Sequence, residues 1–278
     1  MPTSESPVPT FGLIVIGDEI LSGKRTDKHL PKFIELLAER GLALGWAEYV
    51  GDDPARITAV LRRAFASGDV VFCTGGIGAT PDDHTRQCAA AALGVPLVLH
   101  PEAQALIEER MQDVAREKGV PYEPDRPDNR HRLNMGMFPQ GARIMPNPYN
   151  KIPGFALAGP AGAAIYFAPG FPVMAWPMMA WALDTDWSQC FRADAWQERS
   201  VVIHGAMEAT LTPVMERVEA AHPGVKVFSL PSVDHPQHGA HIDLGVKGAP
   251  AAVAAAYADL RAWLVPFGLR YGPELVRP

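Results

Sequence analysis

The first part of the sequence alternates short apolar runs with stretches of helical periodicity, and this alternation limits the folds that the chain can adopt. Strands are predicted at 11–17 (FGLIVIG), where the run is continuously apolar, and at 42–50 and 69–74. An amphipathic helix is predicted after each strand. These three helices begin near Asp27, Asp53 and Asp83. The order strand, helix, strand, helix predicts a mostly parallel sheet with helices on both faces, a three-layer α/β/α fold.

The rest of the chain extends this domain and then changes character. A long helix is predicted at 101–119, a loop-rich, proline-containing surface segment at 122–148, and two hairpin-like strands before a buried helix at 171–183. From residue 199 the order strand, helix, strand, strand, helix predicts a small α+β module. We therefore expect a disordered lead-in at 1–10, an α/β/α domain at 11–190 and a C-terminal α+β module at 199–270.

Composition narrows the partners and the compartment. The formal net charge is −6 and the sequence pI is about 5.8, which argues against a broad contact with nucleic acid. The three cysteines are too few and too scattered for a disulfide framework, so a reducing cytoplasm is the expected setting. Residues 1–10 lack the features of a signal peptide, and 171–183 is too short to span a bilayer. No membrane partner is expected.

Acidic residues follow three predicted strands at the point where each strand ends. The first strand runs into Asp18 and Glu19, the second into Asp52, and the third into Asp82 and Asp83 after a glycine loop. Because the carboxyl ends of parallel strands meet at one edge of a sheet, we expect these carboxylates around one crevice. Three distant segments would thus contribute to one site.

The third strand runs into the string CTGGIGATPDDHT at 73–85. Gly75, Gly76 and Gly78 lack side chains, so their amides can approach an anionic group closely, and the following helix start adds a favourable dipole. The segment LSGKRTDKH adds Lys24, Arg25 and Lys28 near the same edge. Together these features predict a site for a phosphate-containing small molecule.

Carboxylates beside a phosphate cradle would repel the ligand unless a cation stands between them. A hard divalent ion, for which Mg²⁺ is the first choice, resolves this conflict because carboxylate and phosphate oxygens bind it together. The predicted metal ligands are Asp52, Asp82 and Asp83, with Asp52 and Asp83 as the catalytic pair. Structural roles compete with this hypothesis: Thr80 to Asp83 resembles a helix-capping box, and Asp53 is better explained as a helix cap.

The string HPQHGAH presents His235, His238 and His241 within seven residues. Three histidines at this spacing could bind a metal ion, but they lie between two predicted strands. An exposed turn is the favoured interpretation.

Five segments occur in the order found in the molybdopterin-binding, or molybdenum-cofactor-biosynthesis-like, domain family. The chain resembles this family over about 11–183, most closely the N-terminal part of competence/damage-inducible protein A (CinA), and the module from residue 199 resembles that family's middle α+β domain. The shared segments are FGLIVIGDEILSGKRTDKH, YVGDD, CTGGIGATPDDHT, PNPYNKIPGF and APGFP.

The resemblance implies the α/β/α fold, a crevice for molybdopterin or a nucleotide, and association into homodimers or homotrimers. It implies a phosphate loop formed by Gly75, Gly76 and Gly78, and an acidic pair of Asp52 and Asp83. The other residues predicted to contact the ligand are Asp18, Glu19, Asp27, Thr80, Pro169 and Gly170.

Two functions are consistent with the resemblance. The CinA branch is associated with metal-dependent hydrolysis of ADP-ribose, which favours a divalent-metal-dependent pyrophosphatase acting on ADP-ribose or a related nucleotide. The alternative is a module that binds molybdopterin or a nucleotide without hydrolysing it. The sequence shows no region similar to the family's C-terminal amidohydrolase domain, so nicotinamide-nucleotide deamidation is not expected. The family's Gly-Thr-Ala-Pro-Gly-Phe is here Asn-Lys-Ile-Pro-Gly-Phe at 150–155.

Overall fold

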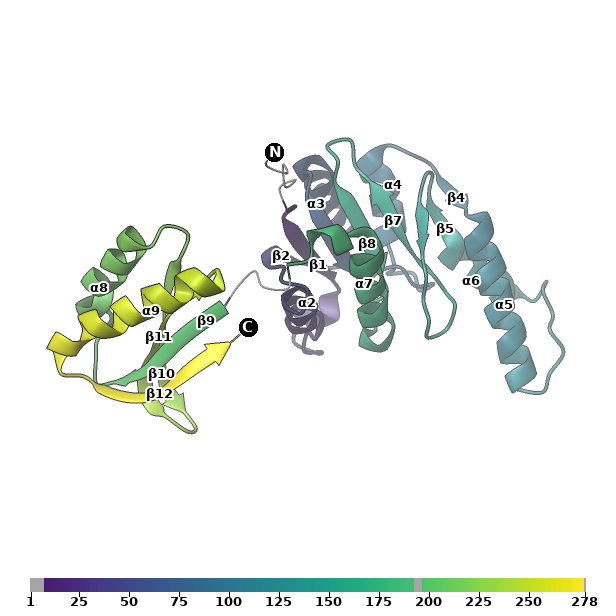
Figure 1. Cartoon of the computed structure of the whole chain (residues 1–278). Coiled ribbons are helices and arrows are strands. Elements are labelled where there is room, and N and C mark those ends of the chain that lie inside the picture. The colour runs from purple at the N-terminus through teal and green to yellow at the C-terminus, as the bar shows by residue number, and fades with distance from the viewer. Residues whose placement is uncertain (1–7, 193–196, 278) are drawn as a thin grey trace. The chain divides into compact units, whose positions relative to one another are not determined.

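A six-stranded sheet is the framework of the unit formed by residues 8–39 and 43–191 (Figure 1). This computed structural model describes residues 8–192 and 197–277. The strands lie side by side in the order β2 (Leu44–Val50), β1 (Phe11–Ile16), β3 (Val70–Thr74), β8 (Ala164–Ala168), β7 (Gly154–Ala158) and β6 (Arg143–Met145). The first four strands run parallel, and β7 and β6 are antiparallel to their neighbours. The predicted mostly parallel sheet is confirmed.

Helices cover both faces of this sheet. One pair is α2 (His29–Ala38) and α7 (Pro172–Asp186), and the other is α3 (Pro54–Ser67) and α4 (Thr85–Leu93). The ring of Phe72 in β3 packs against Phe33 of α2, with ring centres 4.7 Å apart. Its neighbours Val71 and Cys73 belong to the buried cluster that contains Ile57 of α3. Since successive side chains of a strand point to opposite faces, the two helix pairs lie on opposite sides, which gives three layers.

The segment predicted as a loop-rich excursion contains more regular structure than expected. Residues 122–148 include α6 (Pro127–Arg132), the 3₁₀ turn η1 (Leu133–Gly136) and two short strands, β5 (Met137–Pro139) and β6. Strand β5 pairs antiparallel with β4 (Leu97–Leu99), just before the long helix α5 (Pro101–Glu117). These elements were not predicted because they are short, and because the partner of β5 lies about 40 residues away in the sequence.

The second unit comprises residues 192 and 197–277, together with residues 40–42. Its elements are β9 (Gln197–His204), α8 (Glu208–Ala221), β10 (Lys226–His235), β11 (Gly239–Gly248), α9 (Pro250–Leu264), η3 (Val265–Phe267) and β12 (Arg270–Arg277). The antiparallel sheet has the order β10-β11-β9-β12, with both helices packed against it in one buried cluster (Figure 1). This is the ferredoxin-like βαββαβ arrangement, and β12 completes the α+β module predicted at 199–270. The predicted lead-in at 1–10 lies mostly outside the described residues.

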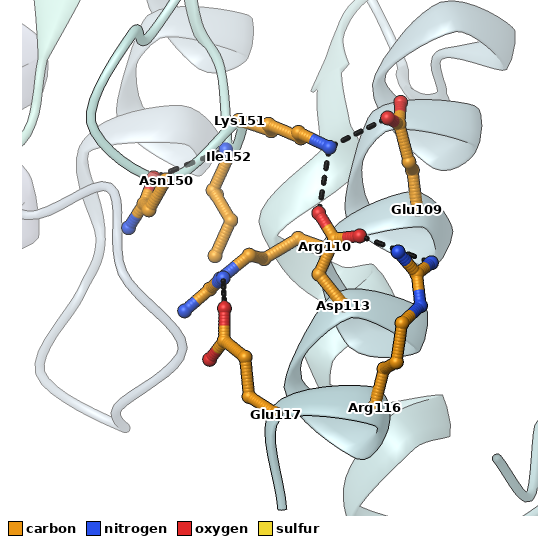
Figure 2. Close-up of polar contacts among 8 residues, drawn as sticks. All are labelled: Glu109, Arg110, Asp113, Arg116, Glu117, Asn150, Lys151 and Ile152. Carbon is orange, nitrogen blue, oxygen red and sulfur yellow. Dashed lines mark hydrogen bonds and ion pairs between the residues drawn. The ribbon is translucent and has the colours of Figure 1, made fainter.

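Lys151 anchors the loop before β7 to helix α5. Figure 2 shows its amine reaching Glu109 and Asp113, with Nζ 2.6 Å from a carboxylate oxygen of each. Asp113 also contacts Arg116, and the hydrogen bond from Lys151 holds the pKa of Asp113 below its usual value. Lys151 has a φ of 65°, which is unfavourable for a residue with a side chain. Lys151 is therefore a structural anchor on α5.

Two substitutions separate the backbone strain at Lys151 from its ion pairs. Both Lys151→Ala and Lys151→Gly remove the contacts with α5, but only glycine accommodates the positive φ without strain. We expect Lys151→Gly to be more stable than Lys151→Ala by about 1 kcal/mol, measured by urea unfolding of both variants. Equal stability of the two variants would contradict a strained backbone.

Candidate functional site

Acidic side chains from three strand ends surround one cavity at the carboxyl edge of the parallel strands. The cavity has a volume of about 610 Å³. It is lined by Asp18, Glu19, Leu21, Ser22, Lys24, Asp52 and Asp82. The predicted meeting of carboxylates after β1, β2 and β3 therefore occurs. We call this space the acidic cavity.

Asp18 and Asp52 form two reciprocal hydrogen bonds between the ends of β1 and β2. Asp18 N donates to Asp52 Oδ2 at 2.9 Å, and Asp52 N donates to Asp18 Oδ1 at 3.2 Å. A side chain at Gly51 would collide with this arrangement, because its Cβ would lie 2.4 Å from Asp18 Oδ1. Each carboxylate thus keeps one oxygen free of these hydrogen bonds.

Asp52 is harder to ionise than an ordinary aspartate. Partial burial raises the pKa of Asp52, and the negative charges of Asp18, Glu19 and Asp82 raise it further, against the lowering effect of the hydrogen bond from Asp18 N. Raised carboxylate pKa values are typical of sites where a protein holds charge for binding or catalysis.

The glycine loop crosses the end of β1, and this path requires residues without side chains. A Cβ at Gly75, whose φ is 97°, would lie 2.1 Å from the carbonyl oxygen of Ile16. A Cβ at Gly76 would lie 2.2 Å from Thr85 Oγ1, which itself donates to the Gly75 carbonyl at 2.9 Å. Within the described part of the chain, the four amides from Gly76 to Ala79 have no acceptor, so they remain available to an anion.

Asp83 does not join Asp52, which corrects the expectation that these two residues share one pocket. Asp83 Oδ2 turns back and accepts from Thr80 N at 2.8 Å and from Thr80 Oγ1 at 2.5 Å. It lines a separate cavity of about 320 Å³ with Thr80, while its neighbour Asp82 faces the acidic cavity. The competing capping interpretation explains this contact in part: Asp83 accepts from Thr80 N as in a capping box, but residues 80–83 form a turn and helix α4 begins only at Thr85.

The side chain of Arg86 holds the glycine loop through a hydrogen bond to its backbone. Its side chain is only 4% exposed, and its two terminal nitrogens donate to the carbonyls of Gly78 and Asn134, each at 2.6 Å. Burial lowers the pKa of Arg86, and the nearby charge of Asp83 opposes this effect. One buried guanidinium therefore joins the glycine loop to η1.

A third cavity of about 360 Å³ adjoins the acidic cavity and shares Glu19 with it. Two nearly inaccessible polar residues line it, His29 at 4% and Thr74 at 1% exposure. His29 Nε2 contacts the Gly170 carbonyl at 3.0 Å, but His29 Nδ1 and Thr74 Oγ1 have no hydrogen-bond partner among the described residues. Buried polar atoms are normally paired, so these two atoms mark a place where a ligand or water would be stabilised.

Other predicted contact residues lie close to the site but serve its framework. Asp27 accepts from the amides of His29 and Leu30 at 2.8 and 3.0 Å, and so caps helix α2 as predicted. It also accepts from the hydroxyl of Tyr49 at 2.8 Å, and burial, followed by this contact, raises the pKa of Tyr49 to about 12. Gly170 lines the third cavity, whereas Pro169 lines none of the three.

Positive charge flanks the carboxylates as predicted. Lys24 lines the acidic cavity, and Arg25 and Lys28 line the third cavity. All three side chains are exposed, and none of them forms an ion pair with another described residue. They are free to contact a ligand's phosphate groups.

A preformed metal centre is not evident. Within 8–192 and 197–277, no group of three or more His, Cys, Asp or Glu side chains is arranged to hold a metal ion. One or two carboxylates of the acidic cavity could still bind a hard cation if phosphate oxygens supplied the other ligands, which is how Mg²⁺ commonly binds. The donor set therefore fits a metal only together with a phosphate-containing ligand.

Sequence reasoning missed His29, Thr74 and Arg86. Each lies within a predicted strand or helix, but nothing in the sequence indicates that its polar side chain is buried at the site. As a separate matter, none of the helices that the structure describes is both long and apolar enough to cross a membrane.

Comparison with known proteins extends this description. Residues 12–186 match the family described as "Probable molybdopterin binding domain". The chain is 36% identical to a CinA-like protein of Gloeobacter violaceus over 164 residues, which cover 59% of this chain and 36% of that protein. It is 29% identical to a protein of Pyrobaculum calidifontis over 238 residues, which cover 84% of this chain and 87% of the other.

A solved structure is similar to the first unit. The crystal structure of "the protein CinA with unknown function" from Thermoplasma acidophilum matches with a TM-score of 0.53 and 26% identity, covering 64% of this chain and 98% of that one. The alignments with the first curated CinA-like relatives span little more than a third of those proteins' length.

The raised pKa of Asp52 predicts a pH-dependent effect on stability. A carboxyl group whose pKa is raised by folding stabilises the folded state while it is protonated, and this contribution is lost as the pH rises through its folded-state pKa. We expect Asp52→Asn to be more stable than the wild type at neutral pH, by less than about 1 kcal/mol because the side chain is half-exposed. The difference should vanish below about pH 4, where wild-type Asp52 is protonated.

Chemical unfolding across this pH range measures the effect. Asp53→Asn is the matched control, because Asp53 Oδ1 caps helix α3 by accepting from Arg56 N and asparagine caps equally well. A stability gain from Asp52→Asn that is the same at every pH would contradict the electrostatic cause.

Proposed function

The chain belongs to the family of probable molybdopterin-binding domains and is CinA-like within it, and from this premise we propose that it hydrolyses a nucleotide pyrophosphate such as ADP-ribose. The observation that carries the proposal is the acidic cavity, which four carboxylates and Lys24 line, with Arg25 and Lys28 lining the cavity next to it. Carboxylates and anion-binding groups side by side suit a ligand that carries phosphates together with a divalent cation.

In this proposal the pyrophosphate and the sugar of the ligand bind in different places. The pyrophosphate lies along the glycine loop, where the amides from Gly76 to Ala79 and the side chains of Lys24 and Arg25 neutralise its charge. The third cavity takes a sugar hydroxyl, because His29 Nδ1 and Thr74 Oγ1 need partners there. Its apolar wall of Val15, Ile16 and Ile20 suits the ring that carries this hydroxyl.

Asp52 is the central acid–base group in the proposed reaction. A water molecule attacks one phosphorus, its proton passes to a carboxylate, and the bond from that phosphorus to the bridging oxygen breaks to release AMP and a sugar phosphate. The raised pKa of Asp52 suits it to accept this proton. A divalent ion bound by Asp82 and by phosphate oxygens of the ligand would lower the pKa of the attacking water and draw charge from the phosphate, leaving Asp52 to accept the proton.

A binding module without turnover is the second candidate, and one observation favours it. The described residues hold no preformed set of three metal ligands, so binding of molybdopterin or a nucleotide could be the whole function. The two functions differ in what Asp52 does. In an enzyme it acts on the rate, whereas in a binding module it acts on affinity alone.

The decisive measurement is AMP release from ADP-ribose by the purified full chain, with Mg²⁺, Mn²⁺ and Co²⁺ tested in turn. We expect metal-dependent release, and Asp52→Asn should reduce the rate by about 100-fold or more while still binding the nucleotide. Asp83→Asn tests the pair implied by the family resemblance. Because Asp83 lies in a different cavity, we expect it to have the smaller effect.

Asp53→Asn serves as the control, since Asp53 adjoins Asp52 in sequence but caps helix α3. No AMP release with any of the three ions would overturn the hydrolase proposal. Nucleotide binding that persists in that case would favour the binding module.

A further inference from the structure

Four histidine rings gather at one end of the sheet in the second unit. They come from the end of β9 (His204), the end of β10 (His235), the following turn (His238) and the start of β11 (His241). The ring of His241 lies 5.2 Å from His235, 5.5 Å from His238 and 6.3 Å from His204, between ring centres. The predicted turn is confirmed, and β9 adds a fourth ring that the HPQHGAH string did not reveal.

Backbone carbonyls fix the proton position on two of these rings. His204 Nδ1 lies 3.4 Å from the Ala240 carbonyl, and His241 Nδ1 lies 2.8 Å from the Gly239 carbonyl. A carbonyl oxygen only accepts, so in a neutral ring the proton is on Nδ1 and the lone pair is on Nε2. Metal-binding histidines commonly have this arrangement, in which one ring nitrogen donates to a carbonyl and the other binds the ion.

The other two rings differ from these in the position of the ring proton. His235 Nδ1 accepts from the amides of Gln237 and His238, each at 3.3 Å, which places the proton of the neutral ring on Nε2. His238 has no ring hydrogen bond to any described residue. Burial and the neighbouring rings of His235, His241 and His204 lower the pKa of His238, which favours the neutral ring. Three rings, therefore, can offer a lone pair, and His235 cannot do so without losing its contacts.

Two ring-centre distances, both measured from His241, are close to those found around a single small ion. Two imidazoles bound tetrahedrally to Zn²⁺ through nitrogens at about 2.0–2.1 Å have ring centres about 5 Å apart. The ring-centre distances of His241 from His238 and His204 are 5.5 and 6.3 Å. No three of the described side chains already stand as metal ligands, so these half-buried rings must turn to bring their nitrogens together.

We propose that His204, His238 and His241 form a binding site for a divalent transition-metal ion, with water as a further ligand. Imidazole ligands suit Zn²⁺, Cu²⁺ and Ni²⁺, and they discriminate against Mg²⁺ and Ca²⁺, which prefer oxygen ligands. The carboxylate of Asp243 is held by Arg277, whose Nη2 lies 2.9 Å from Asp243 Oδ2, while Asp243 Oδ1 is buried and has no partner among the described residues. The site is independent of the acidic cavity and of the proposed hydrolysis.

Calorimetric titration of the full chain with Zn²⁺ tests the proposal. The titration is performed at about pH 7.5, where histidine rings are mostly neutral, and in excess Mg²⁺, which occupies the carboxylate sites. We expect one Zn²⁺ to bind per chain. The substitutions His204→Asn, His238→Asn and His241→Asn should each weaken binding by about tenfold or more, as the loss of a ligand requires.

His235→Asn is the matched control. It removes a ring of the same cluster but keeps an acceptor for the two turn amides, and we expect it to weaken binding by less than about threefold. A loss as large as that of His241→Asn would overturn the assignment of ligands. Absence of Zn²⁺ binding, or binding that survives all three ligand substitutions, would overturn the site itself.

A measurement on the unmodified chain guards against variants that fail to fold. In ¹H–¹⁵N spectra of the imidazoles, Zn²⁺ should shift the Nε2 signals of His204 and His241 and leave their Nδ1–H signals protonated. Shifts confined to other histidines, such as His84 or His131, would contradict the proposal.

Discussion

The path of the glycine loop over the end of β1 is the constraint on which the site depends. The loop passes so close to the Ile16 carbonyl that no side chain fits at Gly75. The crossing carries the segment after β3 over the end of β1, the central strand between β2 and β3, and Asp82 of this segment lines the cavity together with Asp18 and Asp52. With both faces of the sheet covered by helices, the strand ends are where a ligand can reach residues from several strands.

The gathering of carboxylates around the acidic cavity costs stability at a place where it can serve ligand binding. Partial burial makes Asp52 harder to ionise by raising its pKa, and the negative charges of Asp18, Glu19 and Asp82 raise this pKa further. The hydrogen bonds between Asp18 and Asp52 hold the two loops together in spite of this repulsion. Such an arrangement is favourable when a cation or a cation–phosphate pair is bound, and this is the physical reason for assigning the cavity a ligand.

Sequence patterns predicted the framework better than the side-chain directions. The apolar run of β1, the Pro54 start of α3 and the hairpin of β7 and β8 follow from local rules, because each is encoded within a few residues. The elements at 122–148 were missed because their strands are only three residues long. Asp82 and Asp83 are adjacent, and the hydrogen bonds of Thr80 turn Asp83 back while Asp82 lines the cavity; the Thr-x-x-Asp pattern indicated this local contact but not its consequence for the site. The fourth histidine was likewise invisible, because only the pairing of β9 with β11 brings His204 to the hairpin.

The buried guanidinium of Arg86 has a consequence for motion within the first unit. It bridges two carbonyls that lie 56 residues apart along the chain, those of Gly78 and Asn134. A displacement of one segment must either break a charge-assisted hydrogen bond inside the protein or carry the other segment with it. The glycine loop and the segment after α6 therefore form a single mechanical element, and lysine, with one charged nitrogen in place of a planar fork, could not couple them in the same way.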